Sequence, residues 1–282
     1  MGHRAEAEDE LRRANATLEQ RVEERTRELN ERAKDLARSN SELQQFAYVA
    51  SHELQEPLRM VTSFTQLLAK RYKGKLDGDA QEFIHYAVDG AMRMQALISD
   101  LLSYSRVGTQ EKPFESVACD AVLDRVLQNL KIAIDESGAQ VYRQALPEVT
   151  GDPQQLGQLF QNLLSNAIKF HKNDPPRVHV SAKRNGGDWT ISVEDNGIGI
   201  SAEHQDRIFV IFQRLHTKSE YSGTGIGLAV CKKIVERHGG RIWMEASAEK
   251  GATFCFTIPA SQKIRSGQEM KDDGIRIPVT AC

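Results

Sequence analysis

The sequence predicts an all-α coiled coil and helical hairpin, followed by an α+β sandwich. Three observations lead to this fold class. Apolar residues recur every seven positions near the N-terminus, a broad apolar helical pattern returns after a glycine-containing turn, and mixed helix and strand patterns follow a proline-containing linker. The 282 residues allow more than one domain, because a domain averages about 150 residues. We expect the parts to be a coiled coil at 1–45, a helical hairpin at 46–108, a linker at 109–116, a sandwich at 117–260 and a disordered tail at 261–282.

Residues 6–45 contain no proline and have the apolar spacing of a coiled coil. A stripe this narrow cannot be buried by one helix, so a parallel dimeric coil is favoured over a single exposed helix. Polar residues interrupt the second row of the stripe, which would either fix the register of the two helices or let it shift. The first row is Val22, Leu29, Leu36, Leu43 and Ala50; the second is Leu11, Leu18 and Phe46, interrupted by Arg25, Arg32 and Ser39.

The helical pattern continues to Tyr72, and Pro57 is expected to kink it locally. Lys73–Asp79 contains two glycines and is typical of a turn. A second helix with a broad apolar face then extends towards Val107. Two long helices joined by a short turn form an antiparallel hairpin, and two such hairpins about a two-fold axis form a four-helix bundle. We therefore expect a homodimer.

The region after the linker alternates between helical and strand patterns. Asp120 is expected to cap a helix to about Asp135, and Asp152 before Pro153 to open a helix that ends at Phe170. His238 is expected to place a charge at the C-terminus of another helix. Together these patterns predict one mixed sheet with helices on one face. Strands are expected at 178–183, 189–194, 242–246 and 253–258, and the last helix at 225–238.

Composition excludes several classes of function. The 37 basic and 39 acidic residues give a net charge of −2, which argues against a nucleic-acid partner. The four cysteines form no C-x-x-C pair, so neither a zinc ribbon nor a disulfide framework is indicated. Isolated cysteines fit a reducing compartment, so a cytoplasmic location is expected. No apolar run reaches the length of about 18 residues that a membrane span needs, and the charged N-terminus is unlike a signal peptide.

Polar residues on one predicted helix suit magnesium and phosphate. Asn162, Asn166 and Lys169 are spaced by four and three residues, which places them on one helical face. Amide oxygens can bind Mg²⁺, and an ammonium can bind phosphate. A solvated helix face would show the same residues, so this feature is weak alone.

Two glycine-rich segments follow. Asp195-Asn196-Gly197-Ile198-Gly199 comes directly after a strand, where a carboxylate can accept from a base amine and the glycines allow close backbone approach. Gly223-Thr224-Gly225-Ile226-Gly227-Leu228 opens a helix whose backbone N–H groups can hold phosphates. Alone, the first segment could be a simple turn. The second follows no strand of a βαβ unit, which counts against a dinucleotide fold, and the chain contains no P-loop motif.

A polar stretch between the glycine segments is expected to form a lid. Phe209 and Phe212 precede residues 213–222 and would anchor them beside the phosphate site. Arg214 and Lys218 could reach a γ-phosphate from this stretch, although either could equally be a surface charge.

In this order the segments resemble the N, G1, F and G2 boxes of the histidine-kinase branch of the GHKL ATPase superfamily. The resemblance covers about residues 115–260 and implies a Bergerat-type sandwich that binds ATP. It implies that Asn166 holds Mg²⁺ and that Asp195 binds the adenine amine. The further ATP-binding residues that it implies are Asn162, Lys169, Gly197, Gly199, Phe212, Arg214, Gly223, Thr224, Gly225, Gly227 and Leu228.

Gyrase-like members of this superfamily hydrolyse ATP with a glutamate on the N-box helix. Asn162 corresponds to that position here, so the phosphoryl group needs another acceptor. Residues 46–58 contain His52-Glu53-Leu-Gln-Glu56-Pro57 and resemble the H box of sensor kinases, in its phytochrome-type variant. A neutral imidazole is a competent nucleophile near pH 7, and the adjacent Glu53 can take the proton of the other ring nitrogen.

The resemblance implies autophosphorylation of His52 and transfer to an aspartate of a response regulator. Glu56 stands where many family members carry the Thr or Asn that positions water for dephosphorylation of the partner. The resemblance therefore implies kinase activity but does not extend to phosphatase activity. Five residues precede the coil, too few for a sensor domain, and we expect an upstream sensor outside this chain to act through the coil.

Two other functions remain open from sequence. A GHKL ATPase that hydrolyses ATP for conformational work would release free phosphate without labelling the protein. A non-catalytic dimeric scaffold would retain its nucleotide affinity, if any, when Asp195 is replaced by Asn.

Overall fold

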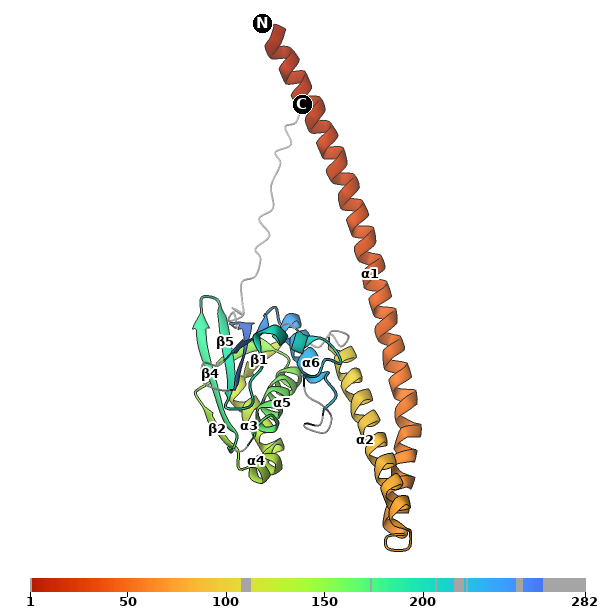
Figure 1. Ribbon diagram of the computed structural model, residues 1–282. Coiled ribbons are helices and arrows are strands. Elements are labelled where there is room, and N and C mark those ends of the chain that lie inside the picture. The colour runs from red at the N-terminus through yellow and green to blue at the C-terminus, as the bar shows by residue number, and fades with distance from the viewer. Residues whose placement is uncertain are drawn as a thin grey trace, which may run out of the picture.

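The computed structural model describes residues 2–107, 113–172, 174–205, 207–215, 221, 223–246 and 251–260, and gives only the backbone for some helical positions. A helical hairpin lies beside an α/β domain, and the second helix of the hairpin is the nearer one to that domain (Figure 1). The predicted tail at 261–282 and residues 109–112 of the predicted linker lie outside the described residues.

The hairpin consists of α1 (Gly2–Arg71) and α2 (Gly78–Arg106), which confirms the predicted turn. Helix α1 continues through Pro57. Asp77 caps α2, because its side chain accepts a 2.8 Å hydrogen bond from the Ala80 N–H.

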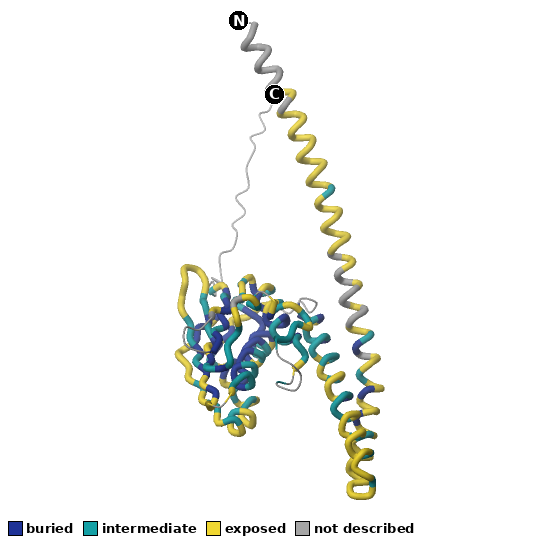
Figure 2. The backbone as a smooth tube through the Cα atoms, in the orientation of Figure 1, coloured by how far each residue is buried: buried dark blue, intermediate teal, exposed yellow. Residues whose placement is uncertain are grey.

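The N-terminal half of α1 projects away from α2 and the α/β domain, and its described side chains are mostly exposed (Figure 2). Val22, Leu29 and Leu36 of the heptad row are all more than half exposed. Next to this row, Glu28 accepts hydrogen bonds from Arg25 and Arg32, at 2.7 and 2.6 Å. The apolar stripe therefore has no cover within the described part of its own chain, which is the arrangement that a coiled-coil partner requires.

The α/β domain contains one mixed sheet, as predicted, but it has five strands where four were expected, because the strand at Gln140–Arg143 was not predicted. Its order is β2-β4-β5-β7-β6, in which β2 and β4 are parallel and the other neighbours antiparallel. A small antiparallel pair, β1 (Glu115–Ala118) with β3 (Glu148–Gly151), was not predicted, and it takes in the last two residues of the predicted linker. The strands of the main sheet are β2 (Gln140–Arg143), β4 (Arg177–Asn185), β5 (Asp188–Asp195), β6 (Ile242–Ala246) and β7 (Ala252–Pro259).

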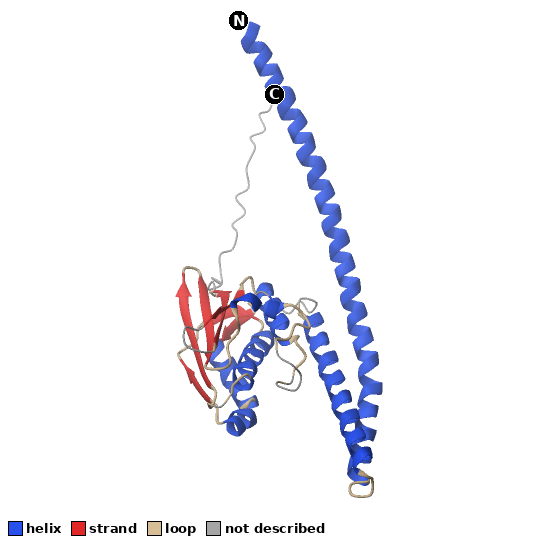
Figure 3. Ribbon diagram, viewed as in Figure 1, coloured by secondary structure: helices blue, strands red, loops and turns tan. Residues whose placement is uncertain are grey.

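Helices cover one face of this sheet (Figure 3). Helix α5 is the central one, and its apolar side is fully buried against the sheet, with the ring of Phe160 edge-on to that of Phe256 at 5.8 Å between centroids. The opposite side of α5 is therefore held in a fixed orientation. The helices of the domain are α3 (Cys119–Asn129), α4 (Lys131–Ser137), α5 (Pro153–Lys169) and α6 (Gly227–Arg237), with short 3₁₀ turns at Ala202–His204 and Arg207–Phe209.

One of the two predicted helix caps is confirmed. Asp152 accepts hydrogen bonds from the N–H groups of Gln154 and Gln155, with Pro153 in the first helical position. The cap predicted at Asp120 is wrong. That residue lies inside α3, its carboxylate accepts from the Leu146 N–H at 3.1 Å, and the predicted single helix is divided at Leu130.

The predicted charge at His238 is also wrong. The ring is buried, Nε2 accepts from the Asp152 N–H at 3.0 Å, and Nδ1 lies 2.8 Å from the Ile234 carbonyl oxygen. Burial lowers the pKa of His238 below its usual value, so the ring is neutral near pH 7. The ring of Phe114 stacks on it at 4.5 Å and thereby fastens the residues just before β1 to the end of α6.

Candidate functional site

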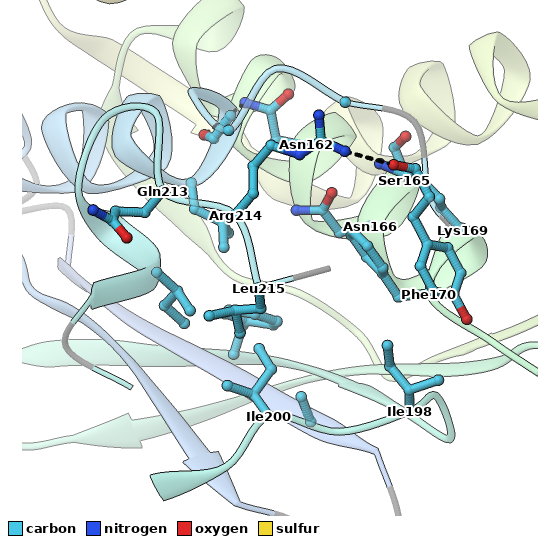
Figure 4. A pocket seen from close by; sticks show the side chains of 18 of the residues that line it. Asn162, Ser165, Asn166, Lys169, Phe170, Ile198, Ile200, Gln213, Arg214 and Leu215 are labelled. Atoms are coloured by element: carbon cyan, nitrogen blue, oxygen red, sulfur yellow. Dashed lines mark hydrogen bonds between the residues drawn. The ribbon is translucent and has the colours of Figure 1, made fainter. Parts of the chain in front are cut away.

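A cavity opens between the polar side of α5, the loop after β5 and the segment that leads into α6 (Figure 4). Apolar side chains form one wall and polar groups gather along another. Ile198, Ile200 and Leu215 belong to the apolar wall, on the opposite side from Asn162 and Asn166. Such a cavity suits a ligand with one flat apolar part and one charged part.

Helix α5 places three polar side chains on the cavity wall, as the spacing predicted. The Asn162 amide donates a 3.1 Å hydrogen bond to the Gly227 carbonyl and so ties α5 to the start of α6. The Asn166 amide points into the cavity (Figure 4). The Lys169 ammonium lies 4.4 Å from the centre of the Phe170 ring, and burial, with the nearby Arg214, lowers its pKa. One side of the helix thus offers amide and cationic groups.

Asp195 lies at the end of β5 and is buried. Its Oδ1 accepts from the N–H groups of Gly197 and Ala252, at 2.8 and 3.1 Å. Burial raises the pKa of the carboxyl, and these two hydrogen bonds act in the opposite direction. With Oδ1 committed to the backbone, Oδ2 is the oxygen left for a ligand.

Glycines are required at two positions of the site where the backbone closely approaches its neighbours. A Cβ on Gly197 would lie 2.3 Å from the Phe170 carbonyl oxygen, and one on Gly225 would lie 2.8 Å from the Gln213 carbonyl oxygen. Gly225 also has a positive φ of 76°. These residues let the loop after β5 and the segment before α6 approach their neighbours closely enough to enclose the cavity.

The segment before α6 brings backbone donors to the polar part of the cavity. Helix α6 begins at Gly227 and has no side-chain cap, so its first N–H groups remain available to a ligand. The positive end of the helix dipole points the same way and favours an anion. The Thr224 hydroxyl adds a side-chain donor at this end.

The two ends of the lid segment are joined to each other, and its C-terminal end is tied to the cavity rim. Arg214 donates a 2.7 Å hydrogen bond to the Tyr221 carbonyl, drawn as a dashed line in Figure 4. The Tyr221 hydroxyl donates to the His171 carbonyl at 2.9 Å, and its ring lies 5.0 Å from the ring of Phe170. Lys218, the other cation predicted for the lid, lies outside the described residues.

The cavity gathers almost all the residues predicted for it. Asp195, the α5 residues, Arg214 and the glycine segment before α6 all line it, and Gly197 lies next to it through its hydrogen bond with Asp195. Phe212 does not line it. This residue has a left-handed backbone, with φ at 65°, and its side chain is 60 % exposed. The predicted role of the Phe212 side chain in ligand contact is therefore not supported by its position. The predicted residues that line the cavity are Asn162, Asn166, Lys169, Asp195, Gly199, Arg214, Gly223, Thr224, Gly225, Gly227 and Leu228.

Sequence reasoning missed several lining residues. Phe170 and Tyr221 provide aromatic surface at the rim, and a signal for the first was present, because Phe170 directly follows the polar helix face. Asp100 also lines the cavity, but it comes from α2, and no sequence pattern connects it with this site.

The predicted phosphoacceptor lies on the hairpin. The His52 backbone belongs to α1, while its side chain lies outside the described part of the structure; Glu53, the next residue, is exposed. Two contacts define the level of position 52 on the hairpin. The Arg106 guanidinium lies 5.5 Å from the centre of the Tyr48 ring, and the Gln66 amide lies 4.0 Å from the Met92 sulfur. In an antiparallel pair these contacts place position 52 level with residues 102–106 of α2.

Comparisons with known proteins match the two parts separately. Residues 42–110 match the family described as His Kinase A (phospho-acceptor) domain, and residues 151–262 match the histidine kinase-, DNA gyrase B-, and HSP90-like ATPase family. The chain is 52 % identical over 256 residues to cyanobacterial phytochrome A of Nostoc sp., covering 91 % of this chain and 33 % of that protein. It is 49 % identical over 232 residues to the phytochrome-like protein Cph1 of Synechocystis sp., covering 82 % and 31 %. The chain thus spans about a third of the length of these relatives.

A solved structure has the same fold. The crystal structure of full-length ShkA in complex with AMPPNP matches with a TM-score of 0.60 and 25 % identity, over 76 % of this chain and 45 % of that one. Within the described part of the chain, no helix is both long enough and apolar enough to cross a membrane.

Proposed function

The chain belongs to the sensor histidine kinases, with a phytochrome-like relationship, and from that premise we propose that it transfers the γ-phosphoryl group of ATP to its own His52. The observation that carries the proposal is the combination, in one chain, of an ATP-type cavity with an amide at Asn162 and a phosphoacceptor hairpin whose second helix packs against α6. Gyrase-like relatives carry a water-activating glutamate at the position of Asn162. A site with an amide there is suited to holding the phosphates for another acceptor.

The cavity has the groups that ATP requires. The carboxylate of Asp195 accepts from the adenine amine through Oδ2, and Phe170 and Ile200 provide apolar surface for the ring. The close approach at Gly197 leaves no room for a side chain between this carboxylate and the ring site. The N–H groups at the start of α6 and the cations Lys169 and Arg214 receive the phosphates.

Asn166 is the residue that would hold Mg²⁺. Its amide points into the cavity and makes no hydrogen bond to the described residues, which leaves its oxygen available to a cation. Amide, water and phosphate oxygens are the ligands that Mg²⁺ prefers. When bound, Mg²⁺ neutralises charge on the phosphates; the protein contributes the position of the amide, fixed by the buried side of α5.

The transfer step needs an aligned nucleophile and little covalent chemistry from the ATP domain. A nitrogen of the His52 imidazole forms a bond to the γ-phosphorus while the bond to the bridging oxygen of ADP breaks. Glu53 takes the proton from the other ring nitrogen, which keeps the attacking nitrogen nucleophilic. In the relay the carboxylate of a response-regulator aspartate then displaces the histidine and takes the phosphoryl group.

Both helical parts are proposed to act as a homodimer. The exposed heptad row of α1 and the exposed apolar residues of the hairpin, among them Phe64, Leu67 and Phe83, would be covered by a second copy of the chain. An upstream sensor, outside this chain, would act through the register or rotation of the coil.

The test is the fate of the γ-phosphate. The protein is incubated with Mg²⁺ and γ-labelled ATP, and label on the protein is compared with free phosphate. A kinase retains label that is stable to alkali and labile to acid. Free phosphate without protein label would instead indicate an ATPase and contradict the proposal.

A further inference from the structure

Two polar contacts fasten the hairpin to the ATP domain. The Thr224 hydroxyl donates a 2.5 Å hydrogen bond to Asp100 Oδ2 on α2. One turn of α2 further on, the Lys233 ammonium on α6 donates a 2.9 Å hydrogen bond to the Tyr104 carbonyl and lies 4.4 Å from the centre of the Tyr104 ring. We call these two contacts the α2 latch.

The first contact lies inside the proposed ATP site. Asp100 lines the cavity together with Thr224 and with the cations Lys169 and Arg214. A carboxylate accepts from the hydroxyl as a phosphate oxygen would, and it adds a negative charge at the end of the cavity that receives phosphates. The Asp100 carboxylate and an ATP phosphate therefore compete for the same hydroxyl and the same cations.

The second contact lies outside the cavity and has a different chemistry. Lys233 does not line the cavity, and burial lowers the pKa of its ammonium. An ammonium that is half-buried against an aromatic ring and a carbonyl is held in place rather than freely solvated. This contact stabilises the position of α6 on α2 without touching the nucleotide site.

The latch also determines where the ATP site lies relative to the phosphoacceptor. Position 52 of α1 is level with residues 102–106 of α2, which include Tyr104. In Figure 1, α2 lies between α1 and the ATP domain. In the latched arrangement the phosphate end of the cavity therefore abuts α2, with the Asp100 carboxylate in it.

The geometry points to an autoinhibitory role for α2. Asp100 accepts the hydrogen bond of the Thr224 hydroxyl in place of a phosphate, and ATP must displace this carboxylate to bind. This inference rests on the proposed function and adds a regulatory contact to the same site. The measured dissociation constant for ATP is then the intrinsic one divided by the fraction of unlatched molecules. Any signal that moves α2 away from α6 would tighten ATP binding.

The test compares ATP affinity in the full chain, by calorimetry with Mg²⁺-ATP, for Asp100→Ala and Asp100→Asn. Removal of a charge-assisted hydrogen bond should tighten ATP binding about 10-fold in Asp100→Ala, which corresponds to about 1.4 kcal/mol. Asp100→Asn keeps an acceptor but loses the charge, so an intermediate tightening is expected. The matched control is Asp89→Ala, which removes a half-exposed aspartate that pairs with Arg93 on the same helix and does not line the cavity, and it should leave ATP affinity unchanged.

A variant outside the cavity separates a latch from a local charge effect. Lys233→Gln removes the second contact without changing any cavity residue, and the latch predicts tighter ATP binding here too, by a few-fold. An effect in the Asp100 variants alone would mean that the carboxylate only repels phosphate and would overturn the latch.

Two more outcomes would contradict the inference. Unchanged or weaker ATP binding in Asp100→Ala would show that Asp100 does not compete with phosphate. Unchanged affinity with slower phosphorylation at saturating ATP would show that the contact belongs to the productive arrangement. If the unmodified chain itself binds no ATP, the proposed function fails, whereas ATP binding that the variants leave unaltered defeats the latch alone.

Discussion

Replacement of Asp195 by Asn tests the adenine end of the site. Oδ1 accepts hydrogen bonds from the backbone N–H groups of Gly197 and Ala252, and the amide oxygen of Asn can accept the same two bonds. The amide nitrogen then stands where Oδ2 stood and presents a donor to the adenine amine, which is also a donor. The substitution should preserve the fold and remove the ligand contact.

The magnitude follows from the hydrogen bond that is lost. A hydrogen bond to a charged partner contributes about 1.5–3 kcal/mol, which corresponds to roughly 10- to 150-fold in affinity. The guanine base has a carbonyl where adenine has its amine, so GTP should bind the Asn variant no worse than it binds the unmodified chain. Preference for ATP over GTP should therefore fall with the ATP affinity.

The assay is a titration of Mg²⁺-ATP and Mg²⁺-GTP against both proteins, with thermal unfolding to confirm that the variant is folded. Asp195→Ala provides a contrast, because it leaves two buried N–H groups without acceptors and should destabilise the domain by about 2–4 kcal/mol. Equal weakening of ATP and GTP, or unchanged ATP affinity, in a folded Asn variant would refute the assignment of Asp195 to the adenine amine.

Three further predictions concern stability and assembly. Gly197→Ala should lower the free energy of unfolding by about 1–3 kcal/mol and weaken ATP binding, because its Cβ would lie 2.3 Å from the Phe170 carbonyl oxygen; Gly187→Ala, with nothing within 4 Å, is the control, and equal effects in a urea titration would count against the crowding argument. Stability should fall as the pH drops below the ordinary His pKa of about 6.5, because burial lowers the pKa of His238 in the folded state and the unfolded chain then binds more protons. Urea unfolding at several pH values should show that the free energy of unfolding changes less with pH in His238→Gln than in the unmodified chain. An equal change in both proteins would mean that other groups cause the pH dependence. Leu29→Ser with Leu36→Ser should raise the dimer dissociation constant at least about 100-fold in sedimentation experiments, because each leucine buried in a coil contributes about 1.5–3 kcal/mol. Arg27→Ser on the outer face should leave it unchanged, and a strictly monomeric parent chain would contradict the coil.

Local sequence signals predicted most of the fold because the interactions behind them are local. Asp152 before Pro153 forms the cap of α5, and the predicted strands at 178–183 and 189–194 lie within β4 and β5. The spacing of Asn162, Asn166 and Lys169 predicts that they share one side of α5, and all three line the cavity.

The features that sequence did not predict depend on contacts between distant segments. Asp120 has the residue type of a helix cap, yet it bonds to Leu146 of a loop 26 residues away. The position of His238 at the end of a helix predicts a terminal charge, but the ring is buried against Asp152 and Phe114. The Asp100–Thr224 contact joins two parts of the chain whose relative position no local pattern specifies.

The phosphoryl acceptor is the most direct test of the account. The unmodified chain and His52→Gln are incubated with Mg²⁺ and γ-labelled ATP, and the label is located by peptide mapping under alkaline conditions. The account predicts phosphohistidine at position 52 in the first protein and no protein label in the second, which should still bind ATP. Label that persists in His52→Gln, or label at another residue of the unmodified chain, would contradict it.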